Sequence, residues 1–216
     1  GQIFDDFSDG DFTNDPSWSG LDSKFTVASQ QLKLQAAPSN DFAYLTIPSK
    51  AINQASWEFL VTLEFSPSTT NYARIYLVSD RPQLDSPLNG YFVQIGNTTD
   101  DVSLFRQSGV ALTKIIDGTD KRLDLPTVAV RIKVTRDDFG QWELLLDVAS
   151  SGTYVSEGTV TDTTHPSSQF FGIFCRYTST RSDKFFFDDF ILTGSPSQDN
   201  LRPTVDSVEV VSPNEL

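Results

Sequence analysis

The chain has 216 residues, and its 16 Lys and Arg against 29 Asp and Glu give a formal net charge of −13. Hydrophobic residues make up 38% and charged residues 21%, which is typical of a globular protein and excludes a disordered or collagen-like chain. No apolar run approaches the roughly 18 residues of a membrane-spanning helix, and the acidic charge argues against nucleic acid and anionic membranes as partners.

Strand signals dominate the whole chain. Phe (17 residues), Val, Ile, Thr and Tyr form short runs that Gly, Pro, Asn, Asp and Ser separate, and no segment has the sustained 3.6-residue period of a helix. In chain order, the runs predict strands at 3–7, 24–27, 31–35, 42–47, 56–66, 71–79, 90–96, 101–107, 111–117, 127–136, 141–149, 152–160, 169–178 and 184–193. Many short strands at this spacing predict an all-β sandwich or barrel.

The hydrophobic pattern separates outer from inner strands. Apolar residues occupy every second position over 127–136 and 141–149, which predicts half-exposed antiparallel strands joined by a hairpin at 136–140. Trp57–Phe65 and Phe170–Phe174 are instead apolar on both faces, which suits the inner strands of a two-sheet antiparallel sandwich.

The composition changes near the C-terminus. Residues 195–203 have the Pro, Ser and polar content of a linker, and 204–216 begins a new alternating strand. We therefore expect a β-sandwich over 1–194, a linker, and the truncated start of a following domain. A tail that belongs to the same domain is the alternative.

Motifs for catalysis are missing. The spacing of the 12 glycines excludes GxGxxG, GxSxG and GxxxxGK, and a single His and a single Cys exclude zinc sites built from these residues. A triad through His165 has no nucleophile elbow to support it. Glu143 and Asp147 share a strand face but lie about 13 Å apart, too far for a glycosidase pair. A pair of carboxylates on two different strands stays open, and we expect a protein that is not an enzyme.

The ends of the predicted domain are acidic. Residues 1–22 hold six Asp and no Lys or Arg. If the first and last strands pair, Asp5, Asp6, Asp188 and Asp189 converge. Strict alternation turns one Asp of each pair inward, where a buried carboxylate needs a partner. A structural Ca²⁺ ion suits such oxygen ligands, and hydrogen bonds from the backbone or Arg are the alternative.

A second group of residues combines aromatic rings with planar hydrogen-bond donors. Rings can stack on the C–H face of a sugar while Arg and Gln hold its hydroxyls, so the group predicts a ligand-binding face. Its members are Arg74, Tyr76, Gln94, Arg106, Arg176 and Tyr177. A structural patch of stacked Arg and Tyr is the alternative. Trp57 and Trp142 fit a core, and Trp18 lies in a turn-rich segment.

Four segments resemble the N-terminal module of large secreted bacterial proteins in which Ig-like and lamin-tail domains follow. These segments are FDDFSDGDF at 4–12, NYARIYLVS at 71–79, LNGYF at 88–92 and FFDDF at 186–190. The resemblance covers about residues 3–194, and RPTVDSV at 202–208 is similar to the opening of an Ig-like domain.

The resemblance implies a concanavalin A-like jelly roll, the lectin and glucanase sandwich, with adjacent first and last strands. Glucanases of that fold carry Glu-x-Asp-x-x-Glu on one strand, and this chain has no such string. We therefore expect a non-catalytic module, secreted or on a bacterial surface, that binds carbohydrate or another cell-surface ligand. A structural or adhesion spacer without a small ligand is the first alternative, and a glycosidase-like enzyme is the second.

Overall fold

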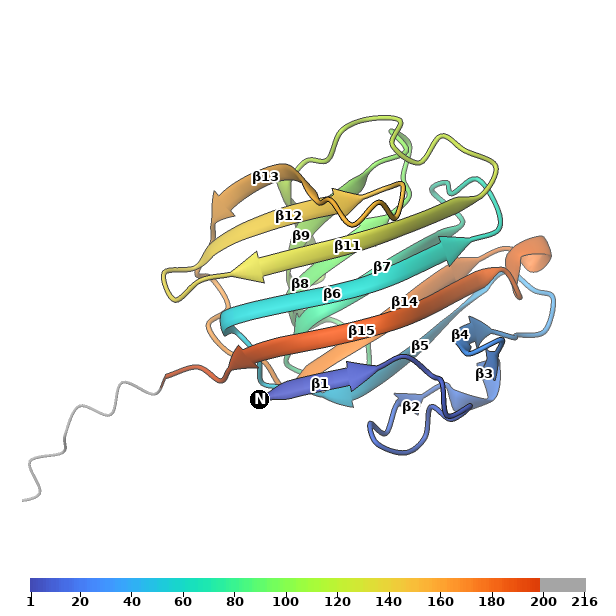
Figure 1. The fold of residues 1–216 in the computed structure, drawn as a ribbon, viewed down its shortest axis with the longest axis horizontal. Helices are drawn as coiled ribbons and strands as arrows, with labels where there is room; N and C mark the ends of the chain where they lie inside the picture. The colour runs from blue at the N-terminus through green and yellow to red at the C-terminus, as the bar shows by residue number, and fades with distance from the viewer. Residues whose placement is uncertain (199–216) are drawn as a thin grey trace, which may run out of the picture.

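Two antiparallel β-sheets pack face to face in the computed structural model, which describes residues 1–198 (Figure 1). The described elements are β1 (Gln2–Asp5), β2 (Ser19–Gly20), the 3-10 turn η1 (Asp22–Lys24), β3 (Phe25–Ala28), β4 (Gln31–Leu34), β5 (Asp41–Pro48), β6 (Asn53–Leu63), β7 (Tyr72–Ser79), β8 (Leu88–Ile95), β9 (Val102–Gly109), β10 (Ala111–Ile116), β11 (Val128–Arg136), β12 (Gln141–Asp147), β13 (Val155–Thr161), β14 (Phe170–Tyr177), the 3-10 turn η2 (Ser179–Arg181) and β15 (Phe185–Ser195).

The eight-stranded sheet has the order β13-β12-β11-β6-β15-β4-β3, and β1 pairs with β15 beside this path. The β1–β15 pairing runs antiparallel from Gln2 opposite Thr193 to Asp5 opposite Phe190. The first and last strands are therefore neighbours, as predicted. The seven-stranded sheet has the order β10-β9-β8-β7-β14-β5-β2.

The predicted two-sheet antiparallel sandwich is confirmed. Each of the fourteen predicted runs contains a strand, and β6 and β14, the runs that are apolar on both faces, have a neighbour on each side. The prediction missed β2, because two residues are too short to show a period. No helix among the described residues is long and apolar enough to cross a membrane.

The core lies between the sheets and is rich in stacked aromatic rings. Trp57 and Trp142 are fully buried, with ring centroids 5.6 Å apart and planes 9° from parallel. Tyr91 packs against Trp142 at 4.4 Å. Rings of this size bury 150–250 Å² each, so they dominate the stability of such a core.

A β-bulge in β15 corrects one expectation about the acidic pairs. Asp188 lies opposite Leu60, but Ile191 lies opposite Glu58, so β15 holds one extra residue there. Asp189 adopts a positive φ of 53°, which accommodates the extra residue in the strand. Phe187 and Phe190 therefore both point into the core, and neither aspartate between them does.

Of the predicted linker at 195–203, residues 199 onward lie outside the described part of the chain, as does all of 204–216.

Candidate functional site

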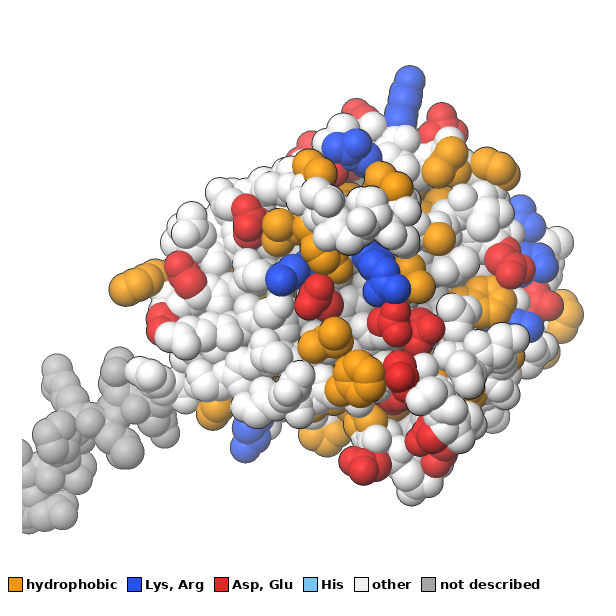
Figure 2. Space-filling view, viewed as in Figure 1, with side chains coloured by type: hydrophobic (Ala, Val, Ile, Leu, Met, Phe, Trp, Pro, Cys, Tyr) orange, Lys and Arg blue, Asp and Glu red, His pale blue; other side chains and the backbone are white. Residues whose placement is uncertain are grey.

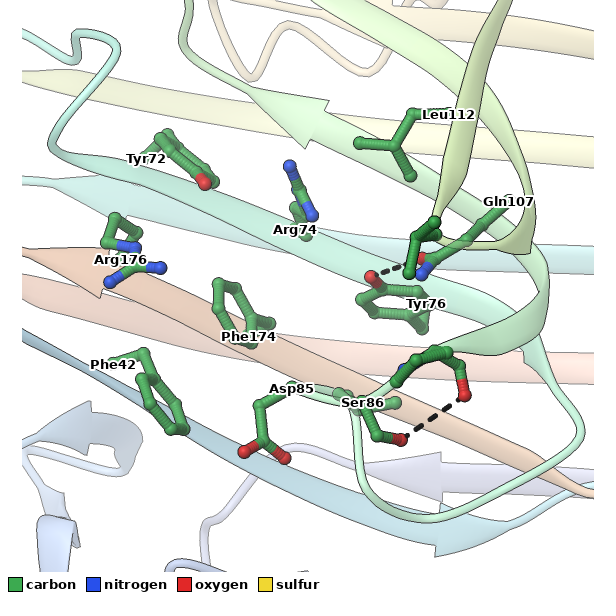
Figure 3. A pocket seen from close by; sticks show the side chains of 13 residues that line it. Phe42, Tyr72, Arg74, Tyr76, Asp85, Ser86, Gln107, Leu112, Phe174 and Arg176 are labelled. Carbon is green, nitrogen blue, oxygen red and sulfur yellow. Dashed lines mark hydrogen bonds between the residues drawn. The ribbon is translucent and has the colours of Figure 1, made fainter.

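A pocket of about 320 Å³ lies on the outer face of the seven-stranded sheet (Figure 3). Its floor comes from β5, β7, β9 and β14, and its rim comes from the β7–β8 loop and the β9–β10 hairpin. The lining residues are Phe42, Tyr72, Arg74, Tyr76, Leu84, Asp85, Ser86, Pro87, Gln107, Val110, Leu112, Phe174 and Arg176.

The floor is set by the register of three neighbouring strands. On β14, Arg176 lies opposite Phe42 of β5 and Tyr72 of β7, and Phe174 lies opposite Arg74 of β7. Side chains two residues apart on a strand share a face, so this register places the five side chains in one surface. The ring centroids of Phe42 and Phe174 lie 5.9 Å apart with planes 11° from parallel, so the two rings form a stacked aromatic pair.

Arg74 is held by rings on its faces and by one hydrogen bond on its edge. Its guanidinium carbon lies 4.6 Å from the ring centre of Phe92, 5.2 Å from Tyr72 and 5.9 Å from Phe174. Its Nε donates to Oε1 of Gln94 at 3.0 Å. These contacts restrict the plane of the guanidinium, and Gln94 accepts only its Nε–H.

Tyr76 brings a buried phenol to the inner end of the pocket. Its side chain is 1% exposed, and its hydroxyl donates to Oε1 of Gln107 at 2.8 Å. Burial raises the pKa of Tyr76 above its usual value, so the phenol stays protonated. The amide nitrogen of Gln107 donates in turn to the carbonyl of Gly109 at 2.9 Å, which holds the hairpin rim in place.

The β7–β8 loop reaches over the floor because of a glycine. Leu84 is buried against the sheet above Gly172, where a Cβ would lie 2.9 Å from Cδ1 of Leu84 and 2.5 Å from a backbone oxygen. Only glycine leaves that space. The seated leucine places Asp85 and Ser86 at the side of the pocket across from the arginines (Figure 3).

Four of the six predicted ligand residues belong to this site. Arg74, Tyr76 and Arg176 line the pocket, and Gln94 holds Arg74 from beside it.

The other two lie on the opposite face of the sheet. Arg106 is registered with the core residue Tyr91 and forms a salt bridge with Asp162. Tyr177 is 1% exposed and belongs to the core between the sheets, although it also borders a second hollow that shares Arg176 with the pocket. Strand alternation could have predicted both positions. Arg106 lies two residues from the buried Leu104 and shares its inward face, and Tyr177 directly follows the outward-facing Arg176.

The prediction missed several lining residues. Phe174 lies two residues before Arg176 and therefore shares its face, whereas Gln107 directly follows Arg106 and therefore lies on the other face. Phe42 follows from the pairing of β5 with β14, which places it opposite Arg176. The loop residues Leu84 to Pro87 carry no sequence signal that places them over this sheet.

The four acidic residues predicted for calcium have other partners. Buried Asp5 accepts the indole N–H of Trp18 at 2.8 Å and the amide N–H of Phe7 at 3.0 Å. Burial raises the pKa of Asp5, and these two bonds counter part of that rise. The expected inward carboxylate thus exists in β1, and it is paired with an indole.

The remaining three aspartates turn outward. Asp6 accepts the amide of Ser8, and Asp189 forms a salt bridge of 2.7 Å with Arg131. Asp188 accepts the amide of its neighbour Asp189. Acidic side chains gather over the corner where β1 and β2 lie (Figures 1 and 2). Within residues 1–198, however, no three His, Cys, Asp or Glu lie together as metal ligands, so the geometry does not fit a calcium ion on these four.

Comparison with solved structures agrees on the fold at low sequence identity. The VIP36 exoplasmic/lumenal domain in its Ca²⁺/Man2-bound form matches with a TM-score of 0.63, 14% identity, and coverage of 93% of this chain and 92% of that chain. A legume lectin-like domain from Entamoeba histolytica matches with a TM-score of 0.57, 10% identity, and coverage of 83% and 89%. The chain has the concanavalin A-like lectin fold.

The carbohydrate-binding module CBM66 from Bacillus subtilis shares this concanavalin A-like fold, with a TM-score of 0.58, 13% identity, and coverage of 82% of this chain and 95% of that chain. By sequence alone, no family model and no curated protein matches the chain. Identities this low show a common fold, and a shared ligand has to be argued from the site.

One contact in this concanavalin A-like fold bears on catalysis. The hydroxyl of Ser108 lies 3.0 Å from Nε2 of His165. A hydrolytic triad needs a carboxylate on the other ring nitrogen, but the nearby Asp162 accepts hydrogen bonds from Tyr91, Arg106 and the amide of Thr164 instead. The Ser108–His165 contact therefore links β9 to the segment between β13 and β14, and Asp162 does not complete a triad with it.

Proposed function

We propose that this protein binds a glycan in the outer-face pocket without acting on it catalytically. The observation that carries the proposal is the combination, in one hollow, of the aromatic rings of Phe42 and Phe174 with Arg74, Arg176 and Gln107. A sugar ring has C–H groups on its face and hydroxyls around its edge. The first suit aromatic rings and the second suit planar donors and amides.

The size of the hollow suits an oligosaccharide. Ligand pockets start at about 300 Å³, and this one measures about 320 Å³. A second hollow of about 290 Å³, lined by Asn40, Asp41, Thr70 and Thr178 among others, shares Arg176 with the first. Because one side chain borders both, a ligand can run from one hollow into the next, with its second unit on hydroxyl and amide groups and on the carboxylate of Asp41.

The structural neighbours support this proposal as analogies. One is a carbohydrate-binding module, and another was solved in a Man2-bound form. Binding of glycans is therefore within the reach of this fold. The resemblance to secreted bacterial proteins extends the proposal to a bacterial role outside the cell. Fractionation of the source organism would test this extension, since the protein should then lie in the medium or envelope.

A glycan array probed with the full 216-residue chain tests the proposal. A positive glycan is then titrated calorimetrically against Tyr72→Ala and Tyr154→Ala. Both tyrosines are half-buried and carry a cation on the ring, Arg74 at 5.2 Å and Lys133 at 5.9 Å, but only Tyr72 lines the pocket.

We expect roughly fivefold weaker binding for Tyr72→Ala and unchanged binding for Tyr154→Ala, since a lost ring contact is worth about one kcal/mol. A blank array with folded protein would contradict the proposal and favour the structural spacer. Equal losses in both variants would place the binding elsewhere.

A further inference from the structure

The two arginines of the pocket are among the four of residues 1–198 that form no salt bridge, the other two being Arg136 and Arg181. Four arginines form salt bridges, namely Arg81, Arg106, Arg122 and Arg131. Arg74 and Arg176 line one pocket, and neither has an ion pair with a carboxylate of residues 1–198. The whole chain has 29 acidic against 16 basic side chains, so counterions are plentiful. Two arginines left without one in the same hollow indicate an anionic ligand.

Arg74 is preorganised for such a ligand. Gln94 accepts its Nε–H, and the rings of Phe92 and Tyr72 cover its faces, so the two terminal nitrogens remain as paired donors. Arg176 lies beside it on the next strand, with its guanidinium carbon 5.8 Å from the ring centre of Phe42. A guanidinium fork of this kind matches the two oxygens of a carboxylate.

Asp41, which lines the second hollow together with Arg176, is already paired with another cation. Asp41 is bound to Nζ of Lys24 at 2.9 Å, and that hydrogen bond is the main reason for the low pKa of Asp41. Arg176 contributes less than Lys24 to lowering that pKa, so the three charges of Lys24, Asp41 and Arg176 sum to one positive charge at this end of the pocket.

The other side of the pocket has the opposite polarity. Asp85 reaches in from the β7–β8 loop, and its carboxylate, after burial, raises the pKa of Tyr44. Ser86 and Gln107 add a hydroxyl and an amide (Figure 3). A ligand that is anionic all round would be repelled by Asp85. A sugar with one acid group and several hydroxyls matches both sides.

Resting on the proposed function, we infer that the glycan is acidic. Its sugar unit in the main pocket is a uronic acid whose carboxylate lies between Arg74 and Arg176, with its hydroxyls toward Asp85 and Gln107. The ring packs on Phe174, and the chain continues past Arg176 into the second hollow.

Methyl esterification removes the negative charge of the carboxylate and leaves the sugar ring and its hydroxyls in place, so it measures the contribution of that charge to binding. The full chain is titrated calorimetrically with short oligomers of galacturonate, glucuronate and mannuronate, with the methyl ester of each oligomer, and with a sulfated neutral oligosaccharide. The same titrations are made with Arg74→Gln, Arg176→Gln and the charge-matched control Arg181→Gln, whose arginine packs on Phe65 outside the pocket. Thermal melting confirms that each variant is folded.

We expect at least one uronate oligomer to bind about tenfold or more tightly than its ester, and each pocket variant to lose about tenfold in affinity and most of this discrimination. Arg181→Gln should keep both. Equal binding of acid and ester, or binding of neutral glycans only, would overturn the acidic ligand while leaving glycan binding intact. Binding of the sulfated sugar alone would overturn the uronate. Silence toward every glycan would overturn the proposed function itself.

Discussion

The indole nitrogen of Trp18 donates a hydrogen bond of 2.8 Å to Oδ2 of Asp5, and both side chains are buried. The other carboxylate oxygen, Oδ1, accepts the amide N–H of Phe7 at 3.0 Å. The bond fastens the turn-rich segment before β2 onto β1. A tryptophan between turns is thus part of the core, where its ring packs 5.0 Å from that of Phe190.

Asp5→Asn should therefore destabilise the fold. The asparagine has one acceptor oxygen for two buried donors, so one donor faces an NH₂ group. We expect the free energy of unfolding in urea to fall by about 1–3 kcal/mol. Asp6→Asn is the matched control, because the single bond from Ser8 needs only one oxygen. A loss as large in the control as in Asp5→Asn would contradict this account.

The architecture of this chain could be predicted because every strand except the two-residue β2 lies in a recognisable run of strand-forming residues. The bulges within those strands could not be predicted. A bulge near Leu77 places both Leu77 and Val78 in the core, although alternation assigns Val78 to the face of Tyr76. The bulge at Asp188 and Asp189 interrupts the alternation of inward and outward side chains in the same way. One extra residue shifts the phase of a strand, and nothing in the local composition marks it.

The pocket was predictable where strands build it and not where loops do. Arg74, Tyr76 and Arg176 follow from the face of a strand. The positions of Asp85 and Ser86 depend on the packing of Leu84 against Gly172, which lies 88 residues later in the chain. That contact is set by the strand order, which alternation alone does not supply.

Calcium removal should leave the stability unchanged. Asp5 is paired with Trp18 and Asp189 with Arg131, so the four aspartates do not present a common set of unpaired oxygens to a divalent ion. We expect the melting temperature with excess Ca²⁺ and with EDTA to agree within about 1 °C. A clear drop in EDTA that Ca²⁺ reverses would restore the calcium prediction and require these side chains to rearrange.

Acid should weaken the fold through Asp162. Burial by itself raises its pKa, but hydrogen bonds from Tyr91, Thr164 and Arg106 outweigh burial and hold the pKa below the ordinary 3.8. A carboxyl whose pKa is lowered by folding stabilises the protein above its unfolded pKa, and this stabilisation is lost as the pH falls through the folded value.

The difference in unfolding free energy between the wild type and Asp162→Asn isolates this effect, because the other carboxyls titrate in both proteins. We expect the difference to be constant from neutral pH down to about pH 4 and to shrink below it. Urea unfolding at a series of pH values measures it. A difference that stays constant to about pH 2.5 would show that the charge of Asp162 contributes nothing.

Leu84→Ala should separate the position of the β7–β8 loop from the stability of the sheet. Leu84 is 3% exposed, and its truncation to Ala should lower the free energy of unfolding by about 2–5 kcal/mol and release Asp85 and Ser86 from their positions in the pocket.

Leu88→Ala is the matched control: Leu88 is 1% exposed in the same aromatic cluster but does not line the pocket. With both variants folded at low temperature, calorimetric titration of a glycan that binds the wild type should show roughly tenfold weaker binding for Leu84→Ala alone, because ordering the loop then costs binding energy. Equal affinities in the two variants would mean that the floor of the sheet, without the loop, makes the site.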